Sequence, residues 1–158
     1  MIPIQNIYYM LSYAFQILNE QGYRNIATEQ FNNTAELMAA ILEKGIANQL
    51  KRGLCKEYIP QTEALSSLRG KIDIAESIKT QSMLRKQLIC TYDEFSVNST
   101  MNQIIKSTVE LLLCSNISKK RKKNLRKLMI YFGEVDFIDL HTVNWNVQYN
   151  RNNQTYRM

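Results

Sequence analysis

The sequence is poor in the residues and runs that mark several common classes of protein. Its 158 residues include 5 glycines and 2 prolines, too few for a fibrous or linker-rich chain. No apolar run approaches the ~20 residues that a membrane helix needs, and the N-terminus lacks the basic start and apolar core of a signal peptide. We therefore expect a soluble protein of the cytoplasm that does not bind a membrane.

Histidine and cysteine are scarce, which limits metal and nucleophile chemistry. His141 is the only histidine, and the three cysteines, Cys55, Cys90 and Cys114, form no Cys-x-x-Cys pair. A zinc site would lack ligands, and no serine or cysteine stands in a recognisable nucleophile motif. We expect three buried or half-buried free thiols, no metal site and no catalytic residue in this chain.

The acidic residues do not form the usual motif of a metal-dependent nuclease. Such enzymes commonly combine an Asp with an Asp/Glu-x-Lys strand that holds the metal and the attacking water. None of the twelve lysines has an acidic residue two positions before it. Asp93 and Glu94 are neighbours on a predicted strand, so they point to opposite faces and cannot share a metal ion directly.

The positive charge is concentrated in one segment. The net charge is +6, and residues 119–127 hold seven basic residues and no acidic one, so the rest of the chain is close to neutral. A helix is predicted here, because Ser118 suits its N-cap and apolar residues recur at helical spacing from Leu125. Two interpretations stay open. The basic face is either simply solvated or contacts DNA phosphates through Lys119, Lys120, Arg121, Lys122 and Lys123.

The periodicities elsewhere predict an α+β fold, with helices packed on a small, mostly antiparallel β-sheet. Helices are predicted over residues 4–19, over about 34–52 between an Asn33 or Thr34 cap and a Gly53 stop, and after Asn98 or Ser99. Strands are predicted over residues 54–63, 68–74, 87–97 and about 134–140, with Pro60 restricting the first to an edge or a bulge. No linker marks two independent domains, so residues 1–158 are predicted to form one domain.

Arg69-Gly70-Lys71 is the other distinctive feature, with two basic residues on one face of a predicted strand. The glycine between them suits the close approach of a partner's backbone or phosphate. A surface strand with a bulge explains the same residues equally well. Both interpretations stay open.

Several motifs together resemble McrC, a subunit of the McrBC restriction system, which cuts DNA that contains modified cytosine. The opening residues 2–15, Ile-Pro-Ile-Gln-Asn-Ile-Tyr-Tyr-Met-Leu-Ser-Tyr-Ala-Phe, carry much of the resemblance. Further matching motifs follow in order over nearly the whole chain: Lys44-Gly45, Arg52-Gly53-Leu54, and residues 69–73, 93–98 and 102–108. Gln5 departs from the pattern, because the family more usually has Arg there.

The resemblance implies a division of labour between subunits. In this family the partner McrB is a GTP-hydrolysing AAA+ ring that also reads modified DNA. The N-terminal half of McrC docks on the ring, enters its pore and stimulates hydrolysis, and the C-terminal half is a Mg²⁺-dependent nuclease. The motifs here match the N-terminal half only. Residues 1–158 are therefore expected to be a partner-docking domain without the nuclease domain.

This expectation assigns partners and sites. The partners are an McrB-like AAA+ GTPase oligomer and, through the complex, DNA. GTP belongs to the partner and Mg²⁺ to the nuclease domain, so no cofactor is expected in this chain. The predicted partner-binding residues are Arg69, Gly70, Lys71 and Asp73. The alternatives are a stand-alone nucleic-acid-binding module that uses the basic helix 119–127, and an inactive remnant.

Overall fold

The computed structural model describes residues 4–14, 26, 30–146 and 156. It divides the chain into two compact units. Residues 1–55 and 100–158 form the first, which we call the helical unit, and residues 56–99 form the second, which we call the ribbon unit. The ribbon unit is thus an insertion in the sequence of the helical unit. The sequence contains no linker that marks the boundary between the two units.

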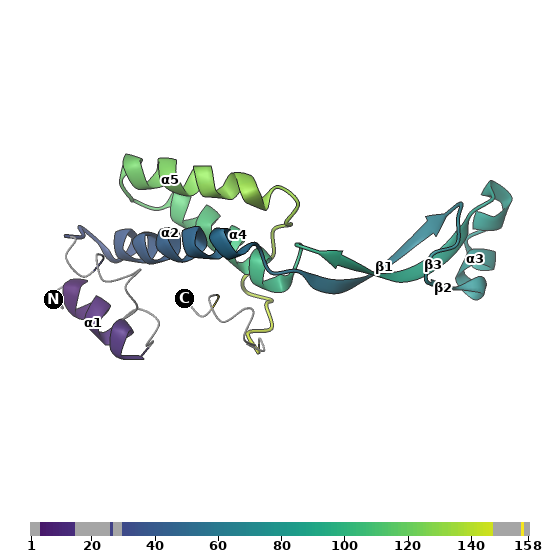
Figure 1. Ribbon diagram of the computed structural model, residues 1–158, viewed down its shortest axis with the longest axis horizontal. Coiled ribbons are helices and arrows are strands. Elements are labelled where there is room, and N and C mark those ends of the chain that lie inside the picture. Colours follow the sequence, from purple (N-terminus) through teal and green to yellow (C-terminus); the bar gives the residue numbers. More distant parts are fainter. Residues whose placement is uncertain (1–3, 15–25, 27–29, 147–155, 157–158) are drawn as a thin grey trace. The chain divides into compact units, whose positions relative to one another are not determined.

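The helical unit is built from helices that pack side by side (Figure 1). Its described helices are α1 (Ile4–Ala14), α2 (Thr34–Arg52), α4 (Thr100–Cys114), α5 (Lys119–Met129) and the short 3₁₀ helix η4 (Ile130–Phe132). Their shared core includes Leu37, Ile46, Val109, Leu125 and Phe132, all of which are inaccessible to solvent. Burial of apolar side chains of this size is the main stabilisation of such a unit.

Local signals set the ends of two of these helices, as predicted. The side chain of Asn33 accepts a hydrogen bond from the backbone N–H of Glu36 at 2.8 Å, which caps α2. Gly53 ends α2 with a φ of 91°, a conformation that favours glycine. Ser118 caps α5 by accepting from the N–H of Arg121.

Helix α1 packs on α2 through a small apolar cluster. Tyr8 of α1 and Leu37, Ala40 and Ile41 of α2 are buried together with Ile26. The predicted continuation of this helix to residue 19 lies outside the described residues. The opposite side of α1 exposes Tyr9, Met10 and Tyr13.

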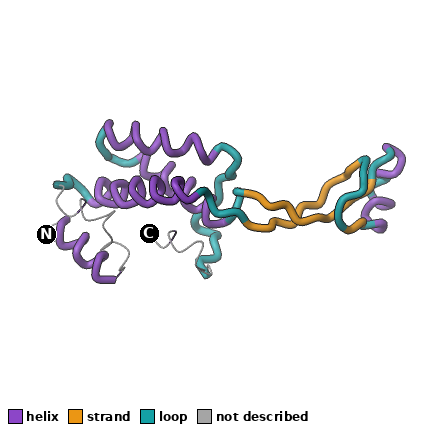
Figure 2. The backbone as a smooth tube through the Cα atoms, in the orientation of Figure 1, coloured by secondary structure: helices purple, strands orange, loops and turns teal. Residues whose placement is uncertain are grey.

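The ribbon unit is a three-stranded antiparallel sheet in the order β1-β3-β2. The long strands β1 (Glu57–Leu65) and β3 (Leu88–Ser96) run side by side as a ribbon (Figure 2). Strand β2 (Lys71–Ile72) pairs with Thr91 and Cys90 of β3. Helix α3 (Ile74–Lys79) packs on β3, and the 3₁₀ helix η3 (Ser82–Arg85) follows it. The α+β class is therefore confirmed, and Pro60 lies on the edge strand β1 as predicted.

Two predicted strands differ from the structure. Strand 68–74 shrinks to two residues, because Asp73 caps α3 and so ends the extended segment. The strand predicted near 134–140 is wrong, because side chains of α4 bind the backbone of this segment. Lys106 Nζ donates to the carbonyls of Phe132 and Val135, and the N–H of Ile138 donates to Ser107 Oγ.

Candidate functional site

The glycine of Arg69-Gly70-Lys71 is explained by the packing of the ribbon unit itself. Gly70 has a φ of 67°, and a Cβ atom there would overlap the carbonyl oxygen of Thr91 and the Cβ of Tyr92. The backbone that approaches this glycine closely is therefore strand β3, rather than a partner. This close approach aligns β2 for pairing with β3.

Asp73 also has a role within the chain. Its carboxylate accepts a hydrogen bond from the N–H of Glu76 at 2.9 Å and caps α3. Its carbonyl accepts from the Ser77 hydroxyl, which in turn accepts from the N–H of Ile89 at 2.8 Å. Ser77 is fully buried, so this chain of hydrogen bonds joins α3 to β3.

Arg69, Lys71 and Asp73 are all exposed, and Arg69 and Lys71 are the two of them that do not cap a helix. The Arg69 guanidinium carbon lies 4.0 Å from the centre of the Tyr92 ring. Tyr92 donates to Glu63 at 3.1 Å, and partial desolvation and this hydrogen bond raise the pKa of Tyr92. Both basic residues lie beside the middle of β3, because Lys71 pairs with Thr91. The end of the ribbon is formed by α3 and η3 instead (Figure 1).

That end carries an exposed apolar surface that sequence reasoning missed. We call it the apolar end, and it consists of Ile74 and Ile78 of α3 and Met83 and Leu84 of η3, with exposed fractions between 53% and 81%. In sequence, Ile74 and Ile78 are spaced like the buried stripe of a helix. The signal was ambiguous, because spacing does not tell whether the chain or a partner covers such a stripe.

The basic residues of α5 separate into two groups. Arg121 is clamped by two glutamates of α2, with Nε 3.0 Å from Glu36 Oε1 and Nη1 2.9 Å from Glu43 Oε2. Glu36 also accepts from the backbone N–H and the hydroxyl of Ser118. Burial alone would raise the pKa of Glu36, but the hydrogen bonds from Ser118 and Arg121 outweigh it and hold that pKa below its usual value. Arg121 thus fastens α5 to α2.

The other predicted DNA-contact residues take no part in this clamp. Lys119, Lys120 and Lys123 are exposed, and Lys122 is half-buried. Among the described residues, none of these four lysines has an ion-pair partner. The structure therefore leaves them available, while it engages Arg121.

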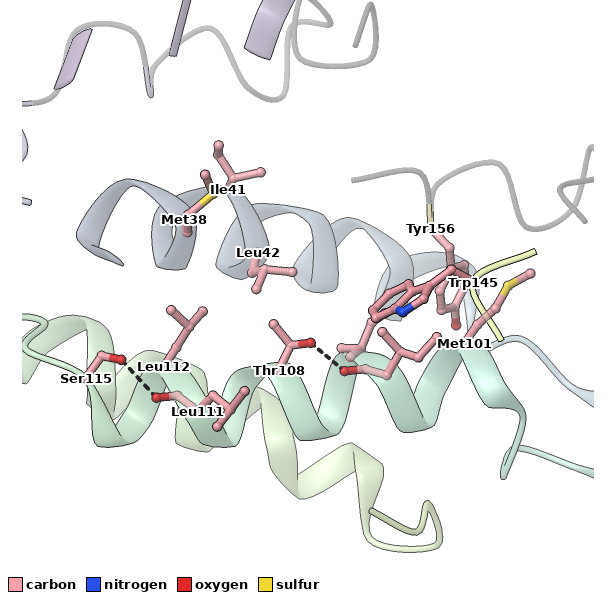
Figure 3. A pocket seen from close by; sticks show the side chains of 12 residues that line it. Met38, Ile41, Leu42, Met101, Thr108, Leu111, Leu112, Ser115, Trp145 and Tyr156 are labelled. Carbon is pink, nitrogen blue, oxygen red and sulfur yellow. Dashed lines mark hydrogen bonds between the residues drawn. The ribbon is translucent and has the colours of Figure 1, made fainter. Parts of the chain in front are cut away.

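An apolar groove of about 530 Å³ lies between α2 and α4 (Figure 3). Trp145 and Tyr156 lie together at one end of it, and its lining is mostly aliphatic. The hydroxyls of Thr108 and Ser115 donate to carbonyls of α4, at 2.7 and 3.0 Å. The lining residues include no carboxylate, imidazole or amine, so they offer apolar contact rather than acid–base chemistry.

A hydrogen-bonded clamp joins the two points where the chain leaves and re-enters the helical unit. Asn102, in the first turn of α4, donates to the carbonyl of Cys55 at 2.9 Å. The Tyr156 hydroxyl donates to Asn102 Oδ1 at 2.6 Å and accepts from the N–H of Cys55 at 2.8 Å. We call these three residues the neck clamp. Asn102 is fully buried.

The remaining sequence-level candidates are scattered. Cys55 is half-buried, Cys90 is buried and Cys114 is exposed, and all three are thiols. The expectation that every thiol would be at least half-buried is therefore wrong for Cys114. No three His, Cys, Asp or Glu side chains in the described part of the chain lie close enough to hold a metal ion. Nor is any described helix long and apolar enough to cross a membrane.

Comparison with known proteins identifies the family to which the chain belongs. A family model described as the McrBC 5-methylcytosine restriction system component matches residues 5–158. The chain belongs to this family. It is 33% identical over 132 residues to the type IV methyl-directed restriction enzyme EcoKMcrBC of Escherichia coli K12, a match that covers 80% of this chain and 38% of that protein.

Two solved structures from Thermococcus gammatolerans share the fold. The cryo-EM structure of its McrBC complex contains a chain with a TM-score of 0.66 and 22% identity, matched over 98% of this chain and 48% of that one. A half-complex of McrB AAA+ hexamers with bound McrC gives a TM-score of 0.64 at 20% identity, over 91% and 37%. The chain thus spans less than half the length of these relatives.

Proposed function

We propose that this chain is the docking part of an McrC-like subunit, which binds an McrB-like AAA+ GTPase oligomer and stimulates its GTP hydrolysis. Three findings support this proposal: membership of the McrBC family, 33% identity to the E. coli protein, and the fold shared with structures that include McrB hexamers with bound McrC. DNA cleavage is assigned to a nuclease domain outside these 158 residues.

The uneven distribution of apolar residues in the ribbon unit carries the proposal. Within this unit, every residue of which the structure describes, Cys90 is the only buried apolar residue. Seven large apolar side chains are exposed there: Tyr58, Leu68, Ile74, Ile78, Met83, Leu84 and Phe95. Exposed apolar patches of this kind mark surfaces that bind other proteins. We therefore assign the ribbon unit to docking.

Arg69 and Lys71 supply the adaptable polar contacts of this surface. A single chain cannot contact every subunit of a symmetric ring in the same way. Long basic side chains reach partners at different positions while their aliphatic stems stay packed. Stacking on Tyr92 holds the guanidinium of Arg69 over β3, so its charge is positioned before a partner arrives.

The test is GTP turnover by an McrB-like protein from the same genome, with and without the full chain. The double variant Arg69→Ala, Lys71→Ala should abolish stimulation, because it removes both exposed charges beside β3. The matched control is Lys51→Ala, Arg52→Ala, which removes two exposed basic residues of α2, outside the ribbon unit. It should stimulate like the unmodified chain. Unchanged stimulation by the double variant would contradict the assignment of these residues.

A second variant tests the apolar end independently. Ile78→Asn with Leu84→Asn changes two exposed side chains, so the fold should survive. We expect at least a tenfold rise in the chain concentration needed for half-maximal stimulation, about the effect of losing 1.4 kcal/mol of binding. If the unmodified chain neither binds nor stimulates the oligomer, the docking function itself is wrong and the inactive remnant is supported.

A further inference from the structure

Among the residues that the structure describes, most of the basic residues of helix α5 make no ion pair that attaches the helix to the rest of the protein. Seven of the residues from Lys119 to Lys127 are basic and none is acidic. Two glutamates of α2 bind one of them, Arg121. The others are the five lysines of this segment and Arg126, and no ion pair compensates any of them within the described residues.

This arrangement opposes the stability of the helix. The N-terminus of a helix carries partial positive charge, and α5 places basic residues and no acidic one in its first turn. Basic residues also recur four positions apart, as in Lys119, Lys123 and Lys127, and like charges at this spacing repel each other. Arg126 and Lys127 suit the negative C-terminal end of the helix dipole, but the basic residues of the first turn are not explained by the fold. A polyanion bound to the outer face would relieve both repulsions.

The packing of α5 favours a polyanion over a membrane surface as the ligand of its basic face. Leu125 is fully buried in the protein, and Leu128 and Met129 are half-buried. The apolar face of α5 is thus already occupied, whereas a helix that lies in a membrane interface must insert that face among the lipids. The exposed residues Lys119, Lys123 and Lys127 form a row along the helix with steps of ~6 Å, four residues of ~1.5 Å rise each.

The same face lacks the groups that read or stack bases. No aromatic residue lies between Lys119 and Met129, so a stacking platform for single strands is absent from this helix. Lysine is a flexible point charge that suits phosphate oxygens without imposing sequence preference. We propose that the outer face of α5 binds the phosphodiester backbone of duplex nucleic acid without sequence preference, independently of the ring-docking ribbon unit.

The test measures binding of the full chain to a fluorescent duplex DNA over a range of salt concentrations. Each phosphate contact contributes about 0.9 to the slope of log affinity against log salt. The triple variant Lys119→Gln, Lys123→Gln, Lys127→Gln should lower that slope by about 2 to 3 and weaken binding at low salt at least tenfold. Thermal unfolding should show an intact or slightly stabilised fold.

A matched control separates a local site from overall charge. Lys51→Gln, Lys79→Gln, Lys86→Gln removes three exposed lysines outside α5 and changes the net charge equally. It should retain nearly the full slope. Equal losses in the two triple variants, or an unchanged slope in the α5 variant, would overturn the proposal. So would the absence of DNA binding by the unmodified chain at low salt, in which case the basic face is only solvated.

Two further probes identify the source of the phosphates. Double-stranded RNA of the same length should bind with similar salt dependence if the backbone is the ligand, and a large preference for either duplex identifies the natural one. Vesicles with anionic lipids should not retain the chain. Vesicle binding that the α5 variant loses, without DNA binding, would contradict the proposal in favour of a membrane surface. The GTP turnover assay is independent of these measurements, so failure of one function leaves the other testable.

Discussion

The helical unit buries many large apolar side chains, although it exposes others such as Tyr13, whereas the ribbon unit buries none of its large ones. Leu37, Leu125 and Phe132 are inaccessible to solvent, but Ile78 and Leu84 are 62% and 81% exposed. The ribbon unit instead buries three serines, Ser77, Ser82 and Ser99, and the hydroxyls of Ser77 and Ser82 bind backbone groups. A small sheet can thus be held by hydrogen bonds while its apolar residues stay available to a partner.

The largest effect on stability is expected when one buried and one exposed apolar residue, one from each unit, are changed to alanine. Leu125→Ala should lower the free energy of unfolding of the helical unit by about 3 kcal/mol, because it leaves a cavity in a packed core. Ile78→Ala should change the stability of the ribbon unit by less than about 0.5 kcal/mol, because the side chain is mostly solvated. Denaturant titrations monitored by hydrogen exchange would measure both. Similar losses in the two variants would refute the contrast.

The next prediction compares the two glycines with positive φ. Gly70→Ala should destabilise the ribbon unit by about 3 kcal/mol, the sum of backbone strain and overlap with β3. Gly53→Ala should cost the helical unit about 1 kcal/mol, because its φ is 91° but no atom lies within 4 Å of the added Cβ. Thermal denaturation of both variants measures the ratio of the two losses of stability. Equal costs would mean that the approach of β3 to Gly70 is not tight.

A third prediction concerns the charged contacts of the helical unit. Glu36→Gln should lower the free energy of unfolding by about 2 kcal/mol, because Arg121 and Ser118 lose a largely buried carboxylate. The folded-state pKa of Glu36 lies below its usual 4.5, so its stabilisation is present above pH 4.5 and is lost as the pH falls through the folded-state value. The variant should lose this acid-dependent part. An unchanged pH profile between pH 7 and the acid transition would contradict the assignment.

The smallest effect is expected at an exposed contact of the ribbon unit. Tyr92→Phe removes the hydrogen bond to Glu63 but keeps the ring beneath Arg69. Stability should hardly change, because exposed hydrogen bonds exchange readily with water. Stimulation of GTP turnover should also persist, since the guanidinium keeps its platform. Tyr92→Leu, which removes the platform, is the informative partner variant in the same assay.

Much of the fold was predictable because the signals are local. The caps Asn33 and Ser118, the stop Gly53 and the edge position of Pro60 each act within a few residues of where they stand. The segment 134–140 was not predictable in this way. Its backbone partners, Lys106 and Ser107, lie about thirty positions earlier, and nothing in an alternating sequence shows that side chains replace a neighbouring strand.

The candidate sites divide along the same line. The basic helix was predictable from composition. Its sequence does not show that Arg121 binds Glu36 and Glu43, which lie 85 and 78 positions away. Gly70 and Asp73 stood out in sequence, yet contacts within the ribbon unit explain both. The apolar end was missed because Ile74 and Ile78 have the spacing of core residues, and their exposure is a property of the folded unit.

The neck clamp holds the two ends of the inserted ribbon unit together, so the length and sequence of the insertion are free to vary. Asn102 binds the carbonyl of Cys55, so residues 47 positions apart are held together whatever the chain between them does. The entropy of closing a loop grows only with the logarithm of its length. Lengthening, trimming or exchanging the ribbon would therefore leave the helical scaffold almost undisturbed. The clamp thus marks where the ribbon, which we propose to bind the partner, could be exchanged for that of a relative while the helical scaffold is kept.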